Sequence, residues 1–485
     1  MDLLFPLRRG GVETLQAQIR QHIAAAIEDG RLPPGARLPS SRALAGNLRV
    51  ARNSVILAYQ RLIDEGYLEA VARRGVRVAA DPLPPDRARS ARSGAEAGHA
   101  GSWDARFALR AAPLRHITKP ADWRRYPYAF LHGQADRTLF PLSVWRSCTR
   151  AALARGAVES WSADEVQEDD RELVRQIRQR ILPRRGVHAE GDEILITLGA
   201  QQALDLVLRL LGGAGRRVAI EDPGYADARN LALVGGATLM PIAIDESGLP
   251  IDDRLAGCDL AYVTPSHQSP TTVTLPFERR VELLARAERD DFVIVEDDYE
   301  TEASYLDSPT PALKSIDRRG RVIYVGTLSK VLAPGLRLGF LVAPPAFVRE
   351  ARALRRLSVR QTPANNQRTA ALFLAGGHYD AMQRRLRRVY RERWSVLREA
   401  IARDLRGCRV RPNRGGTSFW LEGPADLDAD ELARRARAEG VVVEPGRVYF
   451  ADEATAPRNC FRLGFSVIAA DRIDEGIRRL ARAMG

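Results

Sequence analysis

A lysine at the end of a short apolar run is the residue in this sequence most suited to covalent chemistry. Lys330 follows the β-branched run at 322–325 and a turn that begins at Gly326. The chain has three lysines, Lys119, Lys314 and Lys330, and its other side chains of fixed positive charge are arginines. Arginine keeps its proton, whereas a lysine whose pKa is lowered by its surroundings can form an imine. Taken alone, Lys330 is better explained as an ordinary solvated surface lysine.

The run before Lys330 predicts a buried strand whose end faces a ligand site. Short β-branched runs are typical of buried strands, and ligands in open α/β sheets lie at the carboxyl ends of the strands. Similar runs predict further strands at 194–198, 217–220, 260–263 and 292–295. Because these runs alternate with helical stretches, they indicate a parallel α/β sheet.

Each of these four strands is followed by a loop whose residues could bind a ligand. The turn at 199–202 leads into a helix, and backbone N–H groups at such a turn can bind an anion. The residues after the other three strands are Tyr225, His267 with Gln268, and Asp297 with Tyr299. Taken singly, each feature is explained equally well by core packing or by solvation of the sheet edge.

Together these residues meet the needs of one cofactor, pyridoxal phosphate. This cofactor requires an amine for its aldehyde, an anion site for its phosphate and a flat partner for its ring. It also requires a carboxylate that keeps the ring nitrogen protonated. Lys330, the turn at 199–202, Tyr225 and Asp297 supply one of each.

The amino-terminal part of the chain predicts a separate DNA-binding unit. Apolar residues at four-residue spacing indicate a helix over 15–27, and further helices are expected at 41–47 and 52–65. Two short strands, at 67–71 and 76–78, would form a hairpin. Three helices followed by a hairpin are typical of a winged helix-turn-helix, which inserts the start of its recognition helix into the major groove.

The candidate DNA contacts are polar residues at the start of the third helix and arginines near it. Arg52, Asn53 and Ser54 fall on the first turn of that helix, where arginine can bind guanine and asparagine can bind adenine. The candidate phosphate or minor-groove contacts are Arg42, Arg73 and Arg74. The net charge of +13 suggests a polyanionic partner without proving one, since these arginines would also solvate a simple packing unit.

The predicted domains follow from changes in composition along the chain. Residues 1–80 form the DNA-binding head, and residues 81–126, rich in Pro, Ala, Arg, Gly and Ser, predict a flexible linker. A large domain is expected over 127–350, and a helical connection with a small domain over 351–485. The arginine-rich stretch at 354–406 could face DNA, although a solvated helix face is the favoured alternative.

Composition argues against several classes of protein. No apolar run approaches the ~20 residues needed to cross a bilayer, and the amino terminus lacks the pattern of a signal peptide. The four cysteines form no C-x-x-C pair. We therefore expect neither a disulfide framework nor a metal site, and a place in the reducing cytoplasm.

Two parts of the chain resemble known families. Residues 35–45 and 52–68 resemble the DNA-binding domain of the GntR family of bacterial repressors. Residues 130–485 are similar to a fold-type I aminotransferase, and the whole chain resembles the MocR/GabR family of PLP-dependent transcriptional regulators. The implied fold is multidomain. An α-rich winged helix-turn-helix head of the α+β class precedes an α/β fold-type I transferase with a small carboxyl-terminal α+β subdomain.

The resemblance also implies a role for each candidate residue. Lys330 would form the internal aldimine, Asp297 would pair with the pyridine nitrogen and Tyr299 would bond the ring hydroxyl. Tyr225 would stack on the ring, and Arg462 would bind the carboxylate of an effector. The other implied cofactor contacts are Ala200, Gln201, Ser329 or Thr327 and Arg337 at the phosphate, with His267 and Gln268 beside the ring.

Two positions depart from the pattern of the family. Pro270 and Thr271 are followed by Thr272, where many relatives have glycine. GabR-like proteins carry an arginine two residues after the stacking tyrosine, where this chain has Asp227, and the candidate effector contact Arg229 lies further on. This difference argues against a GABA-like effector. If Asp227 faces the pocket, it would favour an effector with a second amino or cationic group.

These observations predict a transcriptional regulator that senses a small amine or amino acid. The effector would displace Lys330 by forming an external aldimine, and the heads would then change their spacing or affinity on a DNA operator. By family likeness we expect a head-to-tail homodimer that reads two half-sites. The alternative is an active aminotransferase with a DNA-binding head. A DNA-binding protein with an inert scaffold is disfavoured because the ring-binding set is complete.

Overall fold

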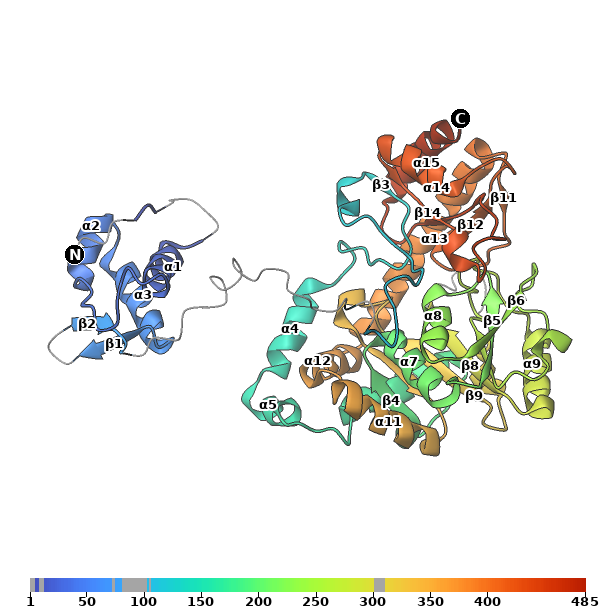
Figure 1. Ribbon diagram of the computed structural model, residues 1–485. Helices are drawn as coiled ribbons and strands as arrows, with labels where there is room; N and C mark the ends of the chain where they lie inside the picture. The colour runs from blue at the N-terminus through green and yellow to red at the C-terminus, as the bar shows by residue number, and fades with distance from the viewer. Residues whose placement is uncertain (1–4, 8–12, 72–74, 81–102, 104–105, 301–309) are drawn as a thin grey trace. The chain divides into compact units, whose positions relative to one another are not determined.

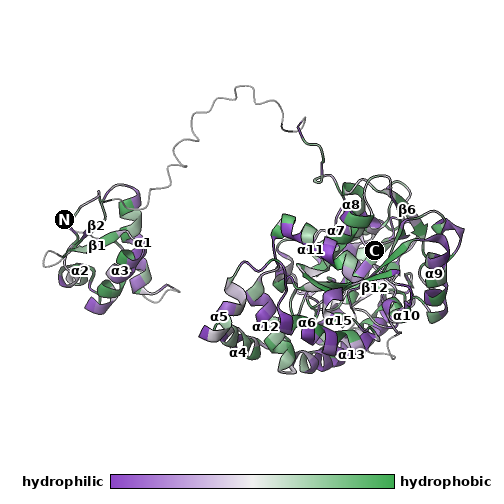
Figure 2. Cartoon of the chain, turned by 90° about the horizontal axis from the view of Figure 1, so that it is seen from below, coloured by the Kyte–Doolittle hydropathy of each residue, from purple (hydrophilic) through white to green (hydrophobic). Residues whose placement is uncertain are grey.

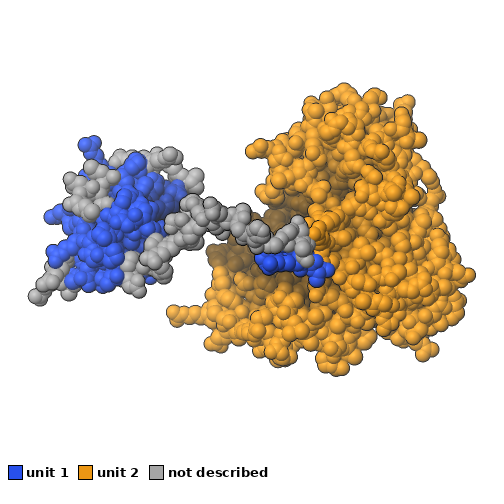
Figure 3. All heavy atoms as spheres, in the orientation of Figure 1, with its two compact units in different colours: residues 1–108 blue, residues 109–485 orange. Residues whose placement is uncertain are grey.

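The protein consists of two compact units, each with its own hydrophobic core (Figure 3). The structure is a computed structural model that describes residues 5–7, 13–71, 75–80, 103, 106–300 and 310–485. The first unit spans Met1–Ala108 and the second spans Leu109–Gly485.

The first unit has three helices and a two-stranded hairpin (Figure 1). Its elements are α1 (Leu15–Glu28), α2 (Ser41–Leu48), α3 (Arg52–Asp64), β1 (Leu68–Val71) and β2 (Gly75–Val78). The Ser40 side chain caps α2 by accepting a hydrogen bond from the backbone N–H of Ala43. Ile19, Leu44 and Leu62 are fully buried between the helices. The predicted winged helix-turn-helix is confirmed.

A seven-stranded sheet organises the second unit. The strand order is β4-β10-β9-β8-β7-β5-β6, and β10 alone runs antiparallel to its neighbours. The strands are β4 (Ile194–Thr197), β5 (Arg217–Asp222), β6 (Thr238–Ala243), β7 (Leu260–Val263), β8 (Val293–Asp298), β9 (Val322–Thr327) and β10 (Gly339–Val342). The five predicted strands are all present, whereas β6 and β10 were not predicted. The sheet is therefore mixed rather than purely parallel.

Helices cover both faces of this sheet because its strands are apolar on both faces. Leu195, Val295 and Ile323 pack with α7 (Gly199–Leu211), α8 (Ala226–Val234) and α11 (Pro345–Val359). The neighbouring residues Ile294 and Val322 point to the other face and pack with α9 (Phe277–Asp290). Figure 2 shows hydrophobic strands surrounded by helices that carry both hydrophobic and hydrophilic residues.

The carboxyl-terminal part forms a smaller α+β layer. Its elements are α12 (Ala364–Ala375), α13 (His378–Asp404), β11 (Arg409–Val410), β12 (Ser418–Glu422), α14 (Ala429–Ala438), β13 (Val441–Val442), β14 (Glu444–Pro445), β15 (Cys460–Gly464) and α15 (Ala470–Met484). Four of its strands form a sheet in the order β11-β12-β15-β14, and β13 pairs with β3 (Tyr128–Ala129). Within the described part of the chain, no helix has the length and apolarity needed to span a membrane.

The segment at 109–126 differs from the flexible linker predicted over 81–126, because it belongs to the second unit and packs within it. Arg115 donates hydrogen bonds to the backbone carbonyls of Phe450 and Ala451, both at 2.9 Å. Ile117 packs against the buried cluster of Trp420, Tyr449 and Cys460. Composition alone did not reveal these contacts, since they are made with residues hundreds of positions further along the chain.

Candidate functional site

A cavity of about 510 Å³ lies at the carboxyl ends of the parallel strands. It is lined by the last residues of β8 and β9, by the first turn of α7 and by the loop after β5. The structure brings together at this cavity most of the predicted site residues: Ala200, Gln201, Tyr225, Asp297, Tyr299, Thr327, Ser329, Lys330, Arg337 and Arg462.

Asp297 is a buried carboxylate with one oxygen left to bind a ligand. It is one of the last residues of β8, and its Oδ2 accepts a 2.9 Å hydrogen bond from the Tyr262 hydroxyl. Among the described residues, its Oδ1 has no hydrogen-bond partner. Burial raises the pKa of Asp297 to about 7. A cationic ring nitrogen at Oδ1 would supply the missing partner and keep the carboxylate charged.

Lys330 lies beside Tyr299, and its amine lies close to Gly133, which has no side chain to clash with it. The Lys330 Nζ is 5.5 Å from the centre of the Tyr299 ring. Burial lowers the pKa of Lys330, so that more of its amine is neutral and nucleophilic. Gly133 has a φ of +71°, and a Cβ there would lie 2.9 Å from the Lys330 Nζ. Burial raises the pKa of the Tyr299 hydroxyl well above its ordinary value, so this group remains a hydrogen-bond donor.

An anion cradle forms where α7 begins. Gly199 has a φ of +72°, and a Cβ there would lie 3.3 Å from the Arg337 guanidinium. The hydroxyls of Thr327 and Ser329 each lie 3.3 Å from the backbone carbonyl of Leu338 and face the same cavity. A helix amino terminus, two hydroxyls and a guanidinium are the groups that bind phosphate in proteins.

Tyr225 connects the cradle to an acidic side chain. Its hydroxyl lies 3.1 Å from the Gln201 Oε1 and 3.2 Å from the Asp227 Oδ2. One hydroxyl proton can serve only one of these acceptors at a time. Asp227 lines the cavity, which was the condition for a role in effector binding.

Arg462 reaches the cavity from the small sheet and is paired with an acid. It lies on β15 directly opposite Glu444 of β14, and its Nε donates to the Glu444 Oε2 at 2.8 Å. The other oxygen of Glu444 accepts from the backbone N–H of His132 at 3.2 Å and lies 3.8 Å from the Lys119 Nζ. Sequence reasoning did not place Glu444, His132 or Lys119 at the site. The rarity of lysine was the one signal that pointed to Lys119.

Three predicted contacts do not line this cavity. The buried Gln268 side chain donates to Glu221 at 3.2 Å and holds the loop after β7 in place. His267 lines a separate cavity of about 460 Å³. Arg229 is buried and donates to the backbone carbonyl of Phe450 at 2.7 Å. In this structure Gln268 and Arg229 therefore have structural contacts, and His267 faces a different cavity.

The described candidate DNA contacts lie on the outside of the head. Arg42, Arg52 and Asn53 are exposed, and Ser54 is half-buried. The Arg52 Nε donates to the Ser41 hydroxyl at 3.3 Å, which links α3 to α2. Arg73 and Arg74 lie outside the described residues.

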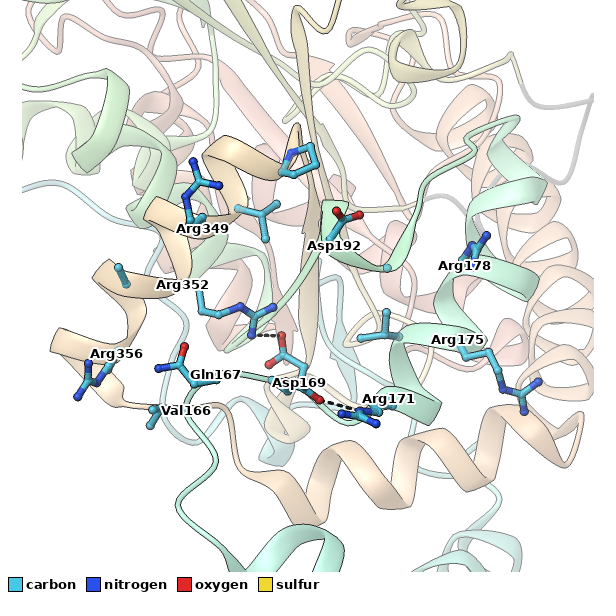
Figure 4. A pocket seen from close by; sticks show the side chains of 16 residues that line it. Val166, Gln167, Asp169, Arg171, Arg175, Arg178, Asp192, Arg349, Arg352 and Arg356 are labelled. Atoms are coloured by element: carbon cyan, nitrogen blue, oxygen red, sulfur yellow. Dashed lines mark hydrogen bonds and ion pairs between the residues drawn. The ribbon is translucent and has the colours of Figure 1, made fainter.

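A larger cavity, of about 750 Å³, opens at the opposite end of the sheet, beside the start of β4 and of α11 (Figure 4). Six arginines line it, but several are paired with acids. Arg352 bonds Asp169 at 2.9 Å, and Arg171 bonds Glu168 at 2.7 Å. None of the predicted site residues lines this cavity, so we do not assign the cofactor to it.

Comparison with known proteins identifies both parts of the chain. Residues 166–480 match the family aminotransferase class I and II, and residues 15–78 match the gntR family of bacterial regulatory proteins. The chain is 46% identical over 480 residues to the HTH-type transcriptional regulator TauR of Rhodobacter capsulatus, covering 99% of this chain and 98% of that protein. It is 32% identical to the probable rhizopine catabolism regulatory protein MocR of Rhizobium meliloti, covering 97% and 93%. The chain belongs to the MocR-type transcriptional regulators.

The body of this MocR-type regulator has the fold of solved aminotransferases. It matches the α-aminoadipate aminotransferase of Thermus thermophilus, complexed with N-(5'-phosphopyridoxyl)-L-leucine, with a TM-score of 0.71 and 30% identity. The match covers 79% of this chain and 98% of that one. Kynurenine aminotransferase of Pyrococcus horikoshii matches with the same TM-score and coverage at 26% identity.

Membership in the aminotransferase class I and II family confirms the predicted cofactor, pyridoxal phosphate. The side chains at the cavity fit it. Asp297 offers an unpartnered oxygen, Lys330 offers an amine, and the start of α7 with Arg337 offers an anion cradle.

Proposed function

We propose that this MocR-type regulator senses a small amine or amino acid at its cofactor site and thereby changes its affinity for a DNA operator. The observation that carries the proposal is the combination, in one chain, of a GntR-type head and a cavity that retains the amine, the carboxylate and the anion cradle. A DNA-binding head has no role in amino-group transfer. An intact cofactor cavity has no role in simple DNA binding.

The side chains of the cavity would divide the work of holding the cofactor. When bound, pyridoxal phosphate supplies an aldehyde that condenses reversibly with a primary amine. The phosphate would be held by Ala200, Gln201, Thr327, Ser329 and Arg337. Asp297 would keep a proton on the ring nitrogen, and Tyr299 would donate to the ring hydroxyl. Lys330 would give up its place at the aldehyde to the amine of the effector.

The effector would couple two parts of the body. Lys330 follows a strand of the large sheet, whereas Arg462 lies on a strand of the small sheet, and both line the same cavity. A ligand with an amine at Lys330 and an acid group at Arg462 would bind best when both parts surround it. Such differential affinity is what shifts a population between conformations.

We infer that the working form is a head-to-tail homodimer in the cytoplasm. Family likeness supports this assembly, and a dimer would present two heads to two operator half-sites. Size-exclusion chromatography with light scattering tests it, and a monomer at micromolar concentration would contradict it.

The decisive experiment measures both properties of the full-length protein together. The visible absorbance of the cofactor is titrated with amines and amino acids, and the anisotropy of a labelled operator fragment is followed in the same samples. We expect the ligand that shifts the absorbance also to shift DNA affinity. A spectral change without any effect on DNA binding would contradict the proposal.

An active aminotransferase is the second candidate, because the cavity retains the groups needed for a half-reaction. Incubation with an amino donor and a keto acid distinguishes the two. Rapid multiple turnover would favour the enzyme, whereas a single slow half-reaction would favour the sensor.

A further inference from the structure

Glu300 is a buried carboxylate beside Lys330 that the proposed function does not use. It lies two residues after the end of β8 and is 3% exposed. Glu300 and Lys330 both line a small cavity of about 20 Å³, which has room for about one water molecule or one ammonium group. Burial lowers the pKa of Lys330, and Glu300 is the acid that opposes this lowering most strongly. The two side chains are therefore electrostatic neighbours.

The hydrogen bonds of Glu300 come from uncharged groups. Its Oε1 accepts from the Thr417 hydroxyl at 2.5 Å, and its Oε2 accepts from the Thr417 backbone N–H at 3.1 Å. The Nδ1 of His132 lies 3.4 Å from Oε1, but burial and the nearby cations hold the pKa of His132 well below its ordinary value, so this ring is neutral. In the part of the chain that the structure describes, Glu300 forms no ion pair with a lysine or an arginine. Its negative charge is available to a cation.

Thr417 connects Glu300 to the small sheet. It directly precedes β12, and its backbone carbonyl accepts from the Phe465 N–H at 2.9 Å, just beyond the end of β15. Gly416 has a φ of +77°, and a Cβ there would lie 3.3 Å from the Glu300 Oε2, so the chain passes close to the carboxylate. Because β15 carries Arg462, a shift of Thr417 relative to Glu300 would move one wall of the cofactor cavity.

Displacement of Lys330 by an effector leaves a positive charge beside Glu300. An effector that arrives as an ammonium ion forms a C=N bond with the cofactor as the C=N bond of Lys330 breaks. If the bonded nitrogen carries no proton before and after this exchange, the three N–H protons and the positive charge of the effector end on the Lys330 nitrogen. An ammonium group in a poorly solvated site costs free energy unless an acid pairs with it.

The other acids near Lys330 have partners of their own. Asp297 faces the ring nitrogen of the cofactor in the proposed function, and Glu444 pairs with Arg462 at 2.8 Å. Both oppose the lowering of the Lys330 pKa less than Glu300 does. Glu300 is therefore the acid best placed to balance the released ammonium group.

We propose that Glu300 is a positioning residue that pairs with the ammonium group of Lys330 once an effector has displaced it, and that this pairing loosens the bonds to Thr417 and lets the small sheet shift. This inference rests on the proposed function and adds how the release of Lys330 would reach the rest of the body. Within the described chain no ion pair joins Lys330 to Glu300, so the carboxylate has to move toward the ammonium group and away from its present position beside Thr417. Release of Lys330 by any amine is then sufficient for a response.

The test uses methylamine as the probe, because this small amine displaces a lysine without offering an acid group to Arg462. The visible absorbance of the full-length protein with bound cofactor is titrated, and the anisotropy of a labelled operator fragment is followed in the same samples. The amino acids that shift the absorbance of wild type are run in parallel. We expect methylamine to shift the absorbance of wild type and to change its DNA affinity about fivefold or more.

Three variants separate the charge of Glu300 from its connection to Thr417. Glu300→Gln removes the charge and should weaken the apparent affinity for methylamine about tenfold. Glu300→Asp retains a carboxylate and should recover most of that affinity. Thr417→Val removes the shorter of the two hydrogen bonds and leaves the charge in place. It should keep the methylamine affinity of wild type, whereas its DNA affinity without amine should already resemble that of amine-bound wild type.

Glu296→Gln is the matched control. Glu296 is a buried acid of β8 whose oxygens accept from the backbone N–H groups of Leu313 and Lys314, and it lines neither of the two cavities. The substitution should change neither readout. Unchanged cofactor absorbance before amine is added shows that each variant has folded around its site.

Three outcomes would overturn the inference. These are wild-type methylamine affinity in Glu300→Gln, equal loss of affinity in Glu300→Gln and Glu300→Asp, and a wild-type DNA response in Thr417→Val. It is also overturned if methylamine leaves the DNA affinity of wild type unchanged although an amino acid alters it. Failure of the proposed function looks different, because then no amine or amino acid would change the DNA affinity of the wild-type protein.

Discussion

Glu444 and Arg462 face each other across β14 and β15, and their side chains form a buried 2.8 Å ion pair at the wall of the cofactor cavity. In aminotransferase-like sites an arginine at this place is expected to bind the carboxylate of the ligand. In this chain the carboxylate of Glu444 already accepts a hydrogen bond from that guanidinium. The charge beside Arg462 is therefore shaped by Lys119 and Glu444 as well as by the arginine itself.

Replacing Glu444 by Gln should change which ligands the site prefers. The variant removes the acid that pairs with both Lys119 and Arg462, so dicarboxylic amino acids should gain about tenfold or more in affinity relative to monocarboxylic ones. It should also lower the melting temperature, because a buried arginine loses its charged partner. Absorbance titrations and thermal denaturation measure the two effects.

Glu439→Gln is the matched control, since Glu439 pairs with Arg482 away from the cavity and both are partly exposed. It should alter neither property appreciably. If Glu444→Gln kept the ligand preference of wild type, Glu444 would have no influence on which ligands bind beside Arg462.

Replacing Lys330 by Arg should abolish the response to effectors while preserving a positive charge. Arginine keeps its proton and cannot condense with the cofactor's aldehyde. We expect the variant to lose the visible absorbance of the lysine-bound cofactor and its rapid exchange with amines. Absorbance spectra before and after amine addition provide the measurement. Rapid exchange with wild-type amplitude in Lys330→Arg would exclude Lys330 as the residue that carries the cofactor.

The parts of the large domain that could be predicted are those where one physical signal dominates. β4 and β9 are apolar and β-branched because both of their faces are buried, and such runs are readable without the structure. β6 was not predicted because Pro241 interrupts it, which an edge strand tolerates. β10 was not predicted although it is as long as β4 and β7, each of four residues, so strand length does not account for the difference.

The same reasoning explains which parts of the site were found. Asp297 and Lys330 were predictable because each lies at or just after the end of a buried strand, where a polar residue is conspicuous. Glu444 reaches the cavity through its pairing with β15, and a single sequence does not reveal which short strands pair. Lys119 was assigned to a linker by composition, since the contacts that hold its segment are made across hundreds of residues.

Asn53 and Arg42 should differ in how they affect DNA binding. If Asn53 reads a base, Asn53→Ala should cost about 1–3 kcal/mol on the operator and relax the preference for one base pair. If Arg42 binds phosphate, Arg42→Ala should weaken binding to all sequences and reduce the salt slope by about one. Operator anisotropy at several salt concentrations, with single-base variants of the site, separates the two.

Arg31→Ala is the control for both, because Arg31 is exposed and paired with Asp29 at 2.7 Å. It should leave affinity and salt slope close to wild type. A uniform loss of affinity in Asn53→Ala, without any relaxed base preference, would mean that Asn53 acts through the backbone of the DNA.

Asp297 should make the stability of the cofactor-free protein depend on pH. Burial raises its pKa from an ordinary 3.8 to about 7 in the folded state. Between these values the unfolded chain ionises while the folded carboxyl keeps its proton, so folding stability falls as pH rises from about 4 to about 7 and levels off above it. Asp297→Asn lacks this ionisation. We therefore expect the variant to gain melting temperature relative to wild type across this range, by a few degrees in total.

The bound cofactor should reverse this difference. A protonated ring nitrogen beside the unpartnered Oδ1 favours the charged carboxylate. Ionisation of Asp297 therefore stabilises wild type when the cofactor is bound, whereas it destabilises wild type in the cofactor-free form. Asp297→Asn should consequently be stabilised less than wild type by added pyridoxal phosphate at pH 8. Thermal denaturation at pH 5, 6.5 and 8, with and without the cofactor, gives all the comparisons. If the two proteins differed by the same amount at every pH in the cofactor-free form, the carboxyl of Asp297 would not titrate in this range, and its pairing with the ring would need another explanation.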